Sequence, residues 1–170
     1  MSNNTNAFEM VKEFHEKFEV QTPDTPYLEI FDDIGVLDLR MKLIKEEWEE
    51  LQDAVANRDF IETIDALADI LVVTIGFGDA IGVDLKKAFE LVHTSNMSKL
   101  CDSEEHAQET VEWYKETRPQ FQPSYRKTKD GQKWLVFDVL TGKVLKNKYY
   151  SAVDLTVLLP SSSTPSEDLS

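Results

Sequence analysis

Four glutamates lie within the stretch LIKEEWEEL, at residues 43 to 51. On a helical wheel, the apolar residues around this stretch fill an arc of about 200°, which is an unusually broad buried face. Glu47 lies near the middle of that arc, and Glu46 and Glu50 lie at one margin of it. Glu49 points outside the arc and is expected to be an ordinary solvated charge. The glutamates are therefore not equivalent.

A second strip of acids follows in the stretch ETIDALADIL. Glu62, Asp65 and Asp69 recur at i, i+3 and i+7, within about 60° of one another on a helical wheel, and Gly76 continues the strip. The remaining residues are so apolar that we predict a helix buried nearly all round. Unpaired carboxylates in such a setting are costly, and no basic residue lies inside this helix. We therefore expect a cation between the two acidic strips.

The ligand types indicate which cation this would be. Oxygen ligands without cysteine or histidine select Mg²⁺, Mn²⁺ or Ca²⁺ over zinc, and two rigid helices with room for water and phosphate favour Mg²⁺. A calcium-binding loop with alternating oxygen ligands is not found in the sequence. The alternative that both strips are plain solvated charge is disfavoured because they lie on adjoining apolar helices.

Composition restricts the class of protein. The chain has 170 residues, of which 41% are hydrophobic, and we expect one domain over residues 1–159. Its net charge of −14, from 18 basic and 32 acidic residues, disfavours DNA or RNA as a partner. No apolar run is long enough to span a bilayer, and the single cysteine, Cys101, precludes an internal disulfide. We expect a soluble, cytoplasmic protein that does not bind membranes.

Periodicity and breaker residues predict the elements that would position these acids. The pattern favours a mainly α protein, a bundle of four to five helices with a small C-terminal β-hairpin. The short NRD link between the two acidic helices makes them antiparallel neighbours. Residues 160–170 are predicted to be a disordered tail. The helices are expected at about 6–20, 38–56, 60–77, 84–94 and 104–117, and the hairpin at about 132–147, turning near Thr141 and Gly142.

These motifs resemble the all-α nucleoside triphosphate pyrophosphohydrolases, a superfamily that includes MazG-like enzymes, phosphoribosyl-ATP pyrophosphohydrolase and dimeric dUTPases. Its E-E-x-x-E motif matches Glu46 to Glu50. In its second motif, E-x-x-D, Asp69 matches the aspartate, but Ala66 stands where the glutamate is usual, so Asp65 or Glu62 must substitute. The stretches DALADILVV, VHTSNMSKL and GKVLK are similar to those of a phage and bacterial branch of MazG-like proteins.

The resemblance implies Mg²⁺-dependent hydrolysis of a nucleoside or deoxynucleoside triphosphate to the monophosphate and pyrophosphate. Metal ions would be held by Glu47, Glu50, Asp69 and Asp65, with Mn²⁺ as a possible substitute, and would activate a water for attack. Glu46 is the candidate general base, although a role as a further metal ligand is almost equally supported.

Four further residues are candidates for substrate binding. By resemblance, Asn96 would contact the sugar or phosphate and Lys99 the phosphates, whereas a plain helix C-terminus also favours lysine. Lys143 and Lys146 are placed to close over the triphosphate, but the surrounding region is generally basic.

Members of the superfamily are mostly dimers or tetramers, and a helix that is apolar on nearly every side also favours a subunit interface. We expect a homodimer or homotetramer. The rival hypothesis is a catalytically weakened regulatory or scaffold protein of the same fold.

Overall fold

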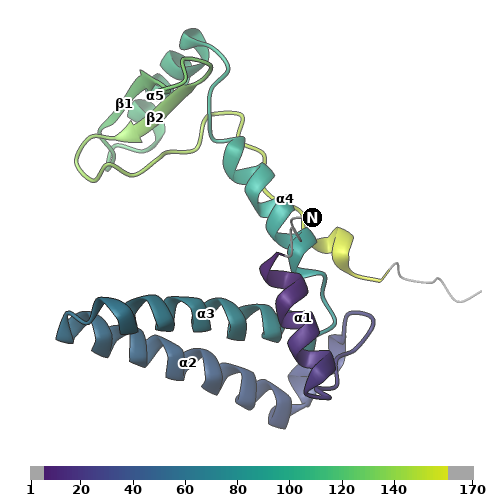
Figure 1. Cartoon of the computed structure of the whole chain (residues 1–170). Coiled ribbons are helices and arrows are strands. Elements are labelled where there is room, and N and C mark those ends of the chain that lie inside the picture. Colours follow the sequence, from purple (N-terminus) through teal and green to yellow (C-terminus); the bar gives the residue numbers. More distant parts are fainter. Residues whose placement is uncertain (1–5, 161–170) are drawn as a thin grey trace, which may run out of the picture. The chain divides into compact units, whose positions relative to one another are not determined.

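The computed structural model of the chain describes residues 6–160 and contains two compact units (Figure 1). Of the described residues, 6–88 and 156–160 belong to unit 1 and 89–155 belong to unit 2. Within the described residues, the chain is mainly helical with a small antiparallel hairpin, as predicted. In chain order the elements are α1 (Ala7–Lys17), η1 (Leu28–Asp32), α2 (Ile34–Asn57), α3 (Phe60–Ala80), α4 (Leu85–Met97), α5 (Glu104–Thr117), β1 (Pro123–Lys127), β2 (Trp134–Asp138) and η2 (Thr156–Leu158).

Short polar side chains begin the helices. Asn6 accepts a hydrogen bond from the backbone N–H of Glu9 at the start of α1. Asp84 accepts one from the N–H of Lys87 at the start of α4. Asp33 caps α2 through the N–H of Val36, so α2 begins four residues earlier than its apolar pattern suggested. These caps satisfy N–H groups that have no partner within the helix.

The two acidic helices form a helical hairpin, and Figure 1 shows α2 and α3 running side by side. Arg58 ends α2 in the left-handed conformation, with φ of 57°. Asp59 then accepts hydrogen bonds from the N–H groups of Ile61 and Glu62, each at 3.1 Å, and begins α3. The predicted antiparallel pairing is therefore produced by a one-residue turn and a cap.

The expectation that α3 is buried nearly all round was wrong for the single chain. Within unit 1, α3 packs mainly against α1 and α2, and one side of α3 remains open to solvent. The open apolar side chains of α2 and α3 include Met41, Trp48, Val55, Ile61, Ile64, Leu67, Leu71 and Val72. We refer to these residues as the apolar face.

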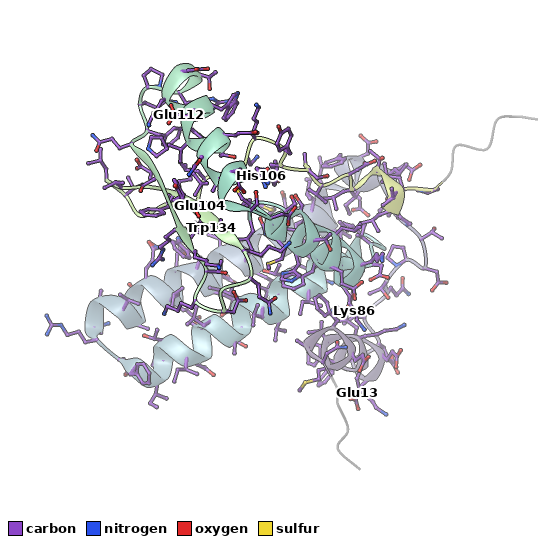
Figure 2. All side chains as sticks on the ribbon, turned by 90° about the horizontal axis from the view of Figure 1, so that it is seen from above. Glu13, Lys86, Glu104, His106, Glu112 and Trp134 are labelled. Carbon is purple, nitrogen blue, oxygen red and sulfur yellow. The ribbon has the colours of Figure 1, made fainter. Side chains whose placement is uncertain are left out.

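Unit 2 has its own hydrophobic core between α5 and the hairpin. Its buried members are Cys101, Ala107, Val111, Tyr114, Val136 and Leu145. Cys101 also pairs with Trp134 through two backbone hydrogen bonds of 2.8 and 2.9 Å, which extends the sheet beyond β2. Figure 2 labels Glu104 and Glu112 on α5 and Trp134 on β2.

The hairpin lies earlier in the chain than predicted. Its strands pair Pro123 with Asp138 and Lys127 with Trp134 at their two ends. The chain does turn at Gly142, with φ of 71°, but there it forms only an isolated bridge instead of a second strand. The strand at residues 123–127 was missed because PSYRK has a single large apolar side chain and so carries almost no alternating pattern.

The described residues bear on two other predictions only in part. The tail predicted at 160–170 lies outside the described residues, apart from Pro160. Among the residues described, no single helix has the length and apolarity to cross a membrane, although α3 and α4 taken together would meet those criteria by length and composition.

A buried carboxylate holds the turn that follows β2. Asp138 is 3% exposed and accepts hydrogen bonds from the Thr141 hydroxyl at 2.6 Å, the Gln122 N–H at 2.8 Å and the Thr141 N–H at 3.2 Å. The hydroxyl bond, followed by the backbone bonds, lowers the pKa of Asp138 below its ordinary value. The charged form of Asp138 is thus the form that stabilises this turn.

Because the folded-state pKa of Asp138 is lowered, its contribution to stability should be complete above the unfolded pKa of about 3.9 and lost as the pH falls through the folded value. Urea unfolding of unit 2, followed by Trp113 and Trp134 fluorescence in a Trp48→Phe background, should therefore show a midpoint that falls on acidification. Asp138→Asn should lower the midpoint at pH 7 and reduce this pH dependence. An unchanged midpoint in the variant at pH 7 would contradict this role.

Candidate functional site

Five acids predicted for the site, Glu46, Glu47, Glu50, Asp65 and Asp69, lie on the paired helices of unit 1. We refer to them as the carboxylate cluster. Glu47 and Asp69 are partly buried, whereas the other three are exposed. The antiparallel pairing of α2 and α3 provides the physical reason that acids separated in sequence can act on one another.

Glu47 is the electrostatic centre of the carboxylate cluster. Its pKa is raised above the ordinary value, first by burial and then by repulsion from Glu50, Asp69, Glu46 and Asp65, in that order. Two of these charges come from α2 and two from α3. The acids of both helices therefore act on the same side chain, and no positive charge of the described residues lowers the pKa of Glu47 in return.

Asp65 is better placed than Glu62 to replace the glutamate that the second motif lacks. Ala66, at the position of the usual glutamate, is 3% exposed and faces the interior. Asp65 contributes to the repulsion at Glu47, whereas Glu62 is not among the charges that raise its pKa. These observations favour Asp65 as the acid that takes the place of the missing glutamate.

Two of the glutamates form lysine pairs on the surface of α2. The Lys42 Nζ lies 3.5 Å from a Glu46 carboxylate oxygen, and the Lys45 Nζ lies 3.3 Å from one of Glu49. Glu49 does not act on Glu47, in agreement with the prediction that it is solvated. Exposed pairs of this kind contribute little to stability, so Glu46 remains free to exchange its lysine for another partner.

The carboxylate cluster meets some of the requirements of a metal site and not others. Within residues 6–160, no three Asp, Glu, His or Cys side chains are grouped closely enough to hold an ion between them. The donor chemistry nevertheless fits a hard divalent cation, because the cluster offers only carboxylate oxygens and leaves Glu47 with an uncompensated charge.

The other predicted site residues belong to unit 2. Asn96, in the last turn of α4, accepts a 2.8 Å hydrogen bond from the Lys99 ammonium. The structure thus brings these two side chains together, although in this pairing the Lys99 charge is directed at a neutral amide instead of an acid. Both side chains are accessible enough to turn toward a ligand.

The two stretches of unit 2 that carry these residues are joined through buried polar side chains. The amide of Asn147 donates to the backbone oxygens of Ser98 and Leu100, at 2.7 and 2.8 Å. The hydroxyl of Ser95 lies 2.8 Å from the Tyr150 hydroxyl and donates to the backbone oxygen of Ser151. Segments about fifty residues apart in the sequence therefore lie side by side.

Lys143 and Lys146 lie on the second of these stretches. Both side chains are exposed. The Lys146 ammonium lies 4.2 Å from the centre of the Tyr150 ring, a cation–π contact that holds the lysine against the surface of unit 2. Lys146 is thereby oriented, whereas Lys143 is placed only by its backbone, which donates to the Thr141 hydroxyl.

One polar cluster was missed by the sequence analysis. His15 on α1, Arg40 on α2 and Asp79 on α3 meet in unit 1, and His15 is 6% exposed. Their residue types and separations in sequence match no motif. The available signal was Gly76, which continues the acidic strip inside an otherwise apolar helix, because a glycine at such a position often marks close approach of another group.

Comparison with known proteins agrees with this arrangement. The profile of the phosphoribosyl-ATP pyrophosphohydrolase family matches residues 11–96, which include all of α2, α3 and the carboxylate cluster. An uncharacterized protein, L479, of Acanthamoeba polyphaga mimivirus is 35% identical over 119 residues, which cover 68% of this chain and 47% of L479. The chain thus matches about half the length of that relative.

The family match extends over half of the chain and contains the helical hairpin with its acids, the features that carried the resemblance in the sequence. The chain therefore belongs to the phosphoribosyl-ATP pyrophosphohydrolase family, within the all-α nucleoside triphosphate pyrophosphohydrolase superfamily.

Proposed function

We propose that this protein hydrolyses a nucleoside or deoxynucleoside triphosphate to the monophosphate and pyrophosphate. The observation that carries the proposal is the uncompensated charge at Glu47, on which acids of both α2 and α3 act. The match to a family of nucleotide pyrophosphohydrolases supports this class of reaction. The proposal also includes the triphosphate as substrate, the roles of the residues, and membership of the phage and bacterial MazG-like branch.

Glu47, Glu50, Asp65 and Asp69 are the residues that would hold Mg²⁺, or Mn²⁺ in its place. The bound metal would supply positive charge against the phosphate oxygens and would make water more acidic. Glu46 is exposed on the edge of the carboxylate cluster. Its carboxylate can accept a proton from water once its ion pair with Lys42 is broken. Asn96, Lys99, Lys143 and Lys146 would contact the sugar and phosphates.

Glu47→Gln should lower kcat/KM for hydrolysis of the preferred triphosphate by about 100-fold or more, because it removes a carboxylate from the centre of the cluster. The measurement is pyrophosphate release from a panel of NTPs and dNTPs with Mg²⁺. Glu49→Gln is the matched control and should remain within about twofold of the wild type, since Glu49 only pairs with Lys45 on the surface. Equal activity of Glu47→Gln and the wild type would exclude Glu47 from the reaction.

Metal binding should also be visible in stability. The raised pKa of Glu47 means that metal-free protein loses stability as the pH rises from about 4.3 through the raised value, because the charged carboxylate is repelled in the folded state. At pH 7, Mg²⁺ at a hundredfold excess over its Kd should stabilise the wild type by about 2.7 kcal/mol.

The free energy of unfolding, from urea titrations followed by far-UV circular dichroism, tests this dependence. Without metal, Glu47→Gln should be at least as stable as the wild type at pH 7, and its gain from Mg²⁺ should be smaller. Equal stabilisation of both proteins by Mg²⁺ would place the metal elsewhere.

The apolar face is proposed to be covered by a second copy of the chain. Trp48 and Leu71 are more than half exposed, at 54% and 59%, and lie on the two paired helices. Exposed apolar patches of this kind mark interaction sites, and closed homo-oligomers are the commonest assemblies. A homodimer, or a homotetramer built from it, would bury these side chains.

Leu67→Asp should convert the oligomer to single chains, because it introduces a charge where apolar side chains must be desolvated. The molar mass of each protein, measured by size-exclusion chromatography with light scattering, is the readout. Asp53→Asn, an exposed substitution on α2, should leave the mass unchanged. A wild-type mass equal to one chain would contradict the assembly.

The alternative function is a regulatory or scaffold protein of the same fold, and Ala66 is the observation that favours it. Ala66 provides no carboxylate where the superfamily motif carries one. Lack of hydrolysis across the whole nucleotide panel, from protein that binds Mg²⁺, would favour this function over the enzyme.

A further inference from the structure

Lys99 and Lys146 of unit 2 carry charges that no carboxylate of the described residues neutralises. The Lys99 ammonium donates to the side-chain oxygen of Asn96 at 2.8 Å, and the Lys146 ammonium lies 4.2 Å from the centre of the Tyr150 ring. A neutral amide and an aromatic ring attract an ammonium but leave its charge in place. Both lysines therefore keep their charge for an anion from outside the chain.

The groups that accompany these lysines are hydrogen-bond donors. Because the side-chain oxygen of Asn96 accepts from Lys99, its NH₂ group is left to donate elsewhere. An ammonium has three N–H bonds and no acceptor. A ligand that accepts from Asn96, Lys99 and Lys146 must present several oxygens, and negative charge on these oxygens strengthens each hydrogen bond. These are the properties of a chain of linked phosphates.

Tyr150 connects Lys146 to the helix that carries Asn96. The Ser95 hydroxyl donates its single hydrogen to the backbone oxygen of Ser151 at 2.8 Å, so the Tyr150 hydroxyl, which lies 2.8 Å away, donates to Ser95. Ser95 is 7% exposed, which shields this bond from water. The ring that holds Lys146 is thereby attached to the last turn of α4, one residue before Asn96.

A second buried contact joins the backbones that carry the two lysines. Asn147 is 6% exposed, and its amide donates to the backbone oxygens of Ser98 and Leu100. Asn147 adjoins Lys146 in the sequence, and Ser98 adjoins Lys99. The two lysines therefore lie on segments that are held together independently of any ligand.

We infer that Asn96, Lys99 and Lys146 form one site for the phosphate chain of the substrate, in which Tyr150 positions Lys146. The inference rests on the proposed function, which requires a triphosphate. A free lysine side chain has many rotamers, and ordering it opposes binding. Contact with the Tyr150 ring removes part of this opposition before the ligand arrives.

Lys143 provides a comparison within the same stretch. In the part of the chain that the structure describes, its ammonium is exposed and contacts neither an aromatic ring nor a carboxylate, and only its backbone is held, by the Thr141 hydroxyl and by Asp138. Ordering of the Lys143 side chain on a ligand therefore opposes binding in full. Lys146 is expected to contribute more than Lys143 to the binding of phosphates.

Calorimetric titration with inorganic tripolyphosphate and with orthophosphate, in metal-free buffer of low ionic strength, tests the site without relying on turnover. The wild type should bind tripolyphosphate at least about tenfold more tightly, because linked phosphates offer charged oxygens to both lysines at once. Lys99→Met and Lys146→Met should each weaken tripolyphosphate binding by about tenfold or more and bring the ratio of the two affinities toward one. Equal affinity of the wild type for both anions would overturn a shared site.

The positioning role of Tyr150 is tested by a double-mutant comparison. Tyr150→Leu should weaken tripolyphosphate binding by about two- to fivefold, as expected when an exposed cation–π contact is lost. In the Lys146→Met background, where no ammonium remains to be positioned, Tyr150→Leu should cause no further loss. A merely structural role of Tyr150 would weaken binding in both backgrounds, and that result would overturn the positioning role.

A more conservative variant guards against misfolding. Tyr150→Phe keeps the ring but loses the hydrogen bond to Ser95, so its affinity for tripolyphosphate should lie between those of the wild type and Tyr150→Leu. Circular dichroism spectra of all variants should superimpose, which separates loss of the site from loss of the fold. Wild-type affinity in both Tyr150 variants would contradict the role of the ring.

The matched control is Lys148→Met, which removes the same charge from the same stretch. The Lys148 ammonium lies 5.6 Å from the centre of a different ring, that of Tyr149, whose hydroxyl donates to Glu109 on α5. Lys148→Met should therefore keep the affinity for tripolyphosphate within about twofold of the wild type. A loss as large as that of Lys146→Met would indicate attraction by overall charge and would overturn the site.

The outcomes distinguish this inference from the proposed function. If the protein hydrolyses triphosphates, Tyr150→Leu should raise KM and leave kcat nearly unchanged, because the phosphate contact is made before and during the reaction. Hydrolysis with an unchanged KM in Tyr150→Leu and Lys146→Met would overturn the phosphate site and leave the enzyme intact. Tripolyphosphate binding that depends on Lys146 and Tyr150, in a protein that hydrolyses no nucleotide, would support the site and overturn the activity. A wild type that binds no tripolyphosphate would overturn the inference.

Discussion

Repulsion among carboxylates on two paired helices is the constraint around which unit 1 is organised. Folding brings acids of α3 close to Glu47, although each added negative charge makes ionisation of Glu47 less favourable. The apolar packing of α2 on α3 and the capped turn at Asp59 hold the helices in this arrangement. A fold that keeps such repulsion is suited to receive positive charge from outside the chain.

The helices were largely predictable from the sequence because local interactions determine them. Capping residues and apolar periodicity located α3 and α5 closely, and α5 extends from Glu104 to Thr117 as expected. The antiparallel pairing that lets the charge of Asp69 act on Glu47 was also predictable, because a link as short as NRD makes two helices antiparallel neighbours. Local reasoning succeeded where the partner lies nearby in the sequence.

The remaining features depend on contacts between distant segments. β1 was missed because Tyr125 is its one large apolar side chain, and its pairing with β2 is determined by the core beneath it. The meeting of His15 with Asp79 depends on how α1 packs on α3, which no spacing along the chain encodes. The open side of α3 was also mispredicted, since an apolar sequence shows that a surface avoids water but not which molecule covers it.

The two hydrogen bonds from Asn147 to the backbone oxygens of Ser98 and Leu100 have a consequence for how this chain can change over evolution. They bring the start and the end of the segment that contains α5 and the hairpin to one place. The segment thus begins and ends at the same place and has its own core. Its length can therefore change while its two ends remain joined. Relatives are free to shorten, lengthen or replace it and still keep the polypeptide on either side in register.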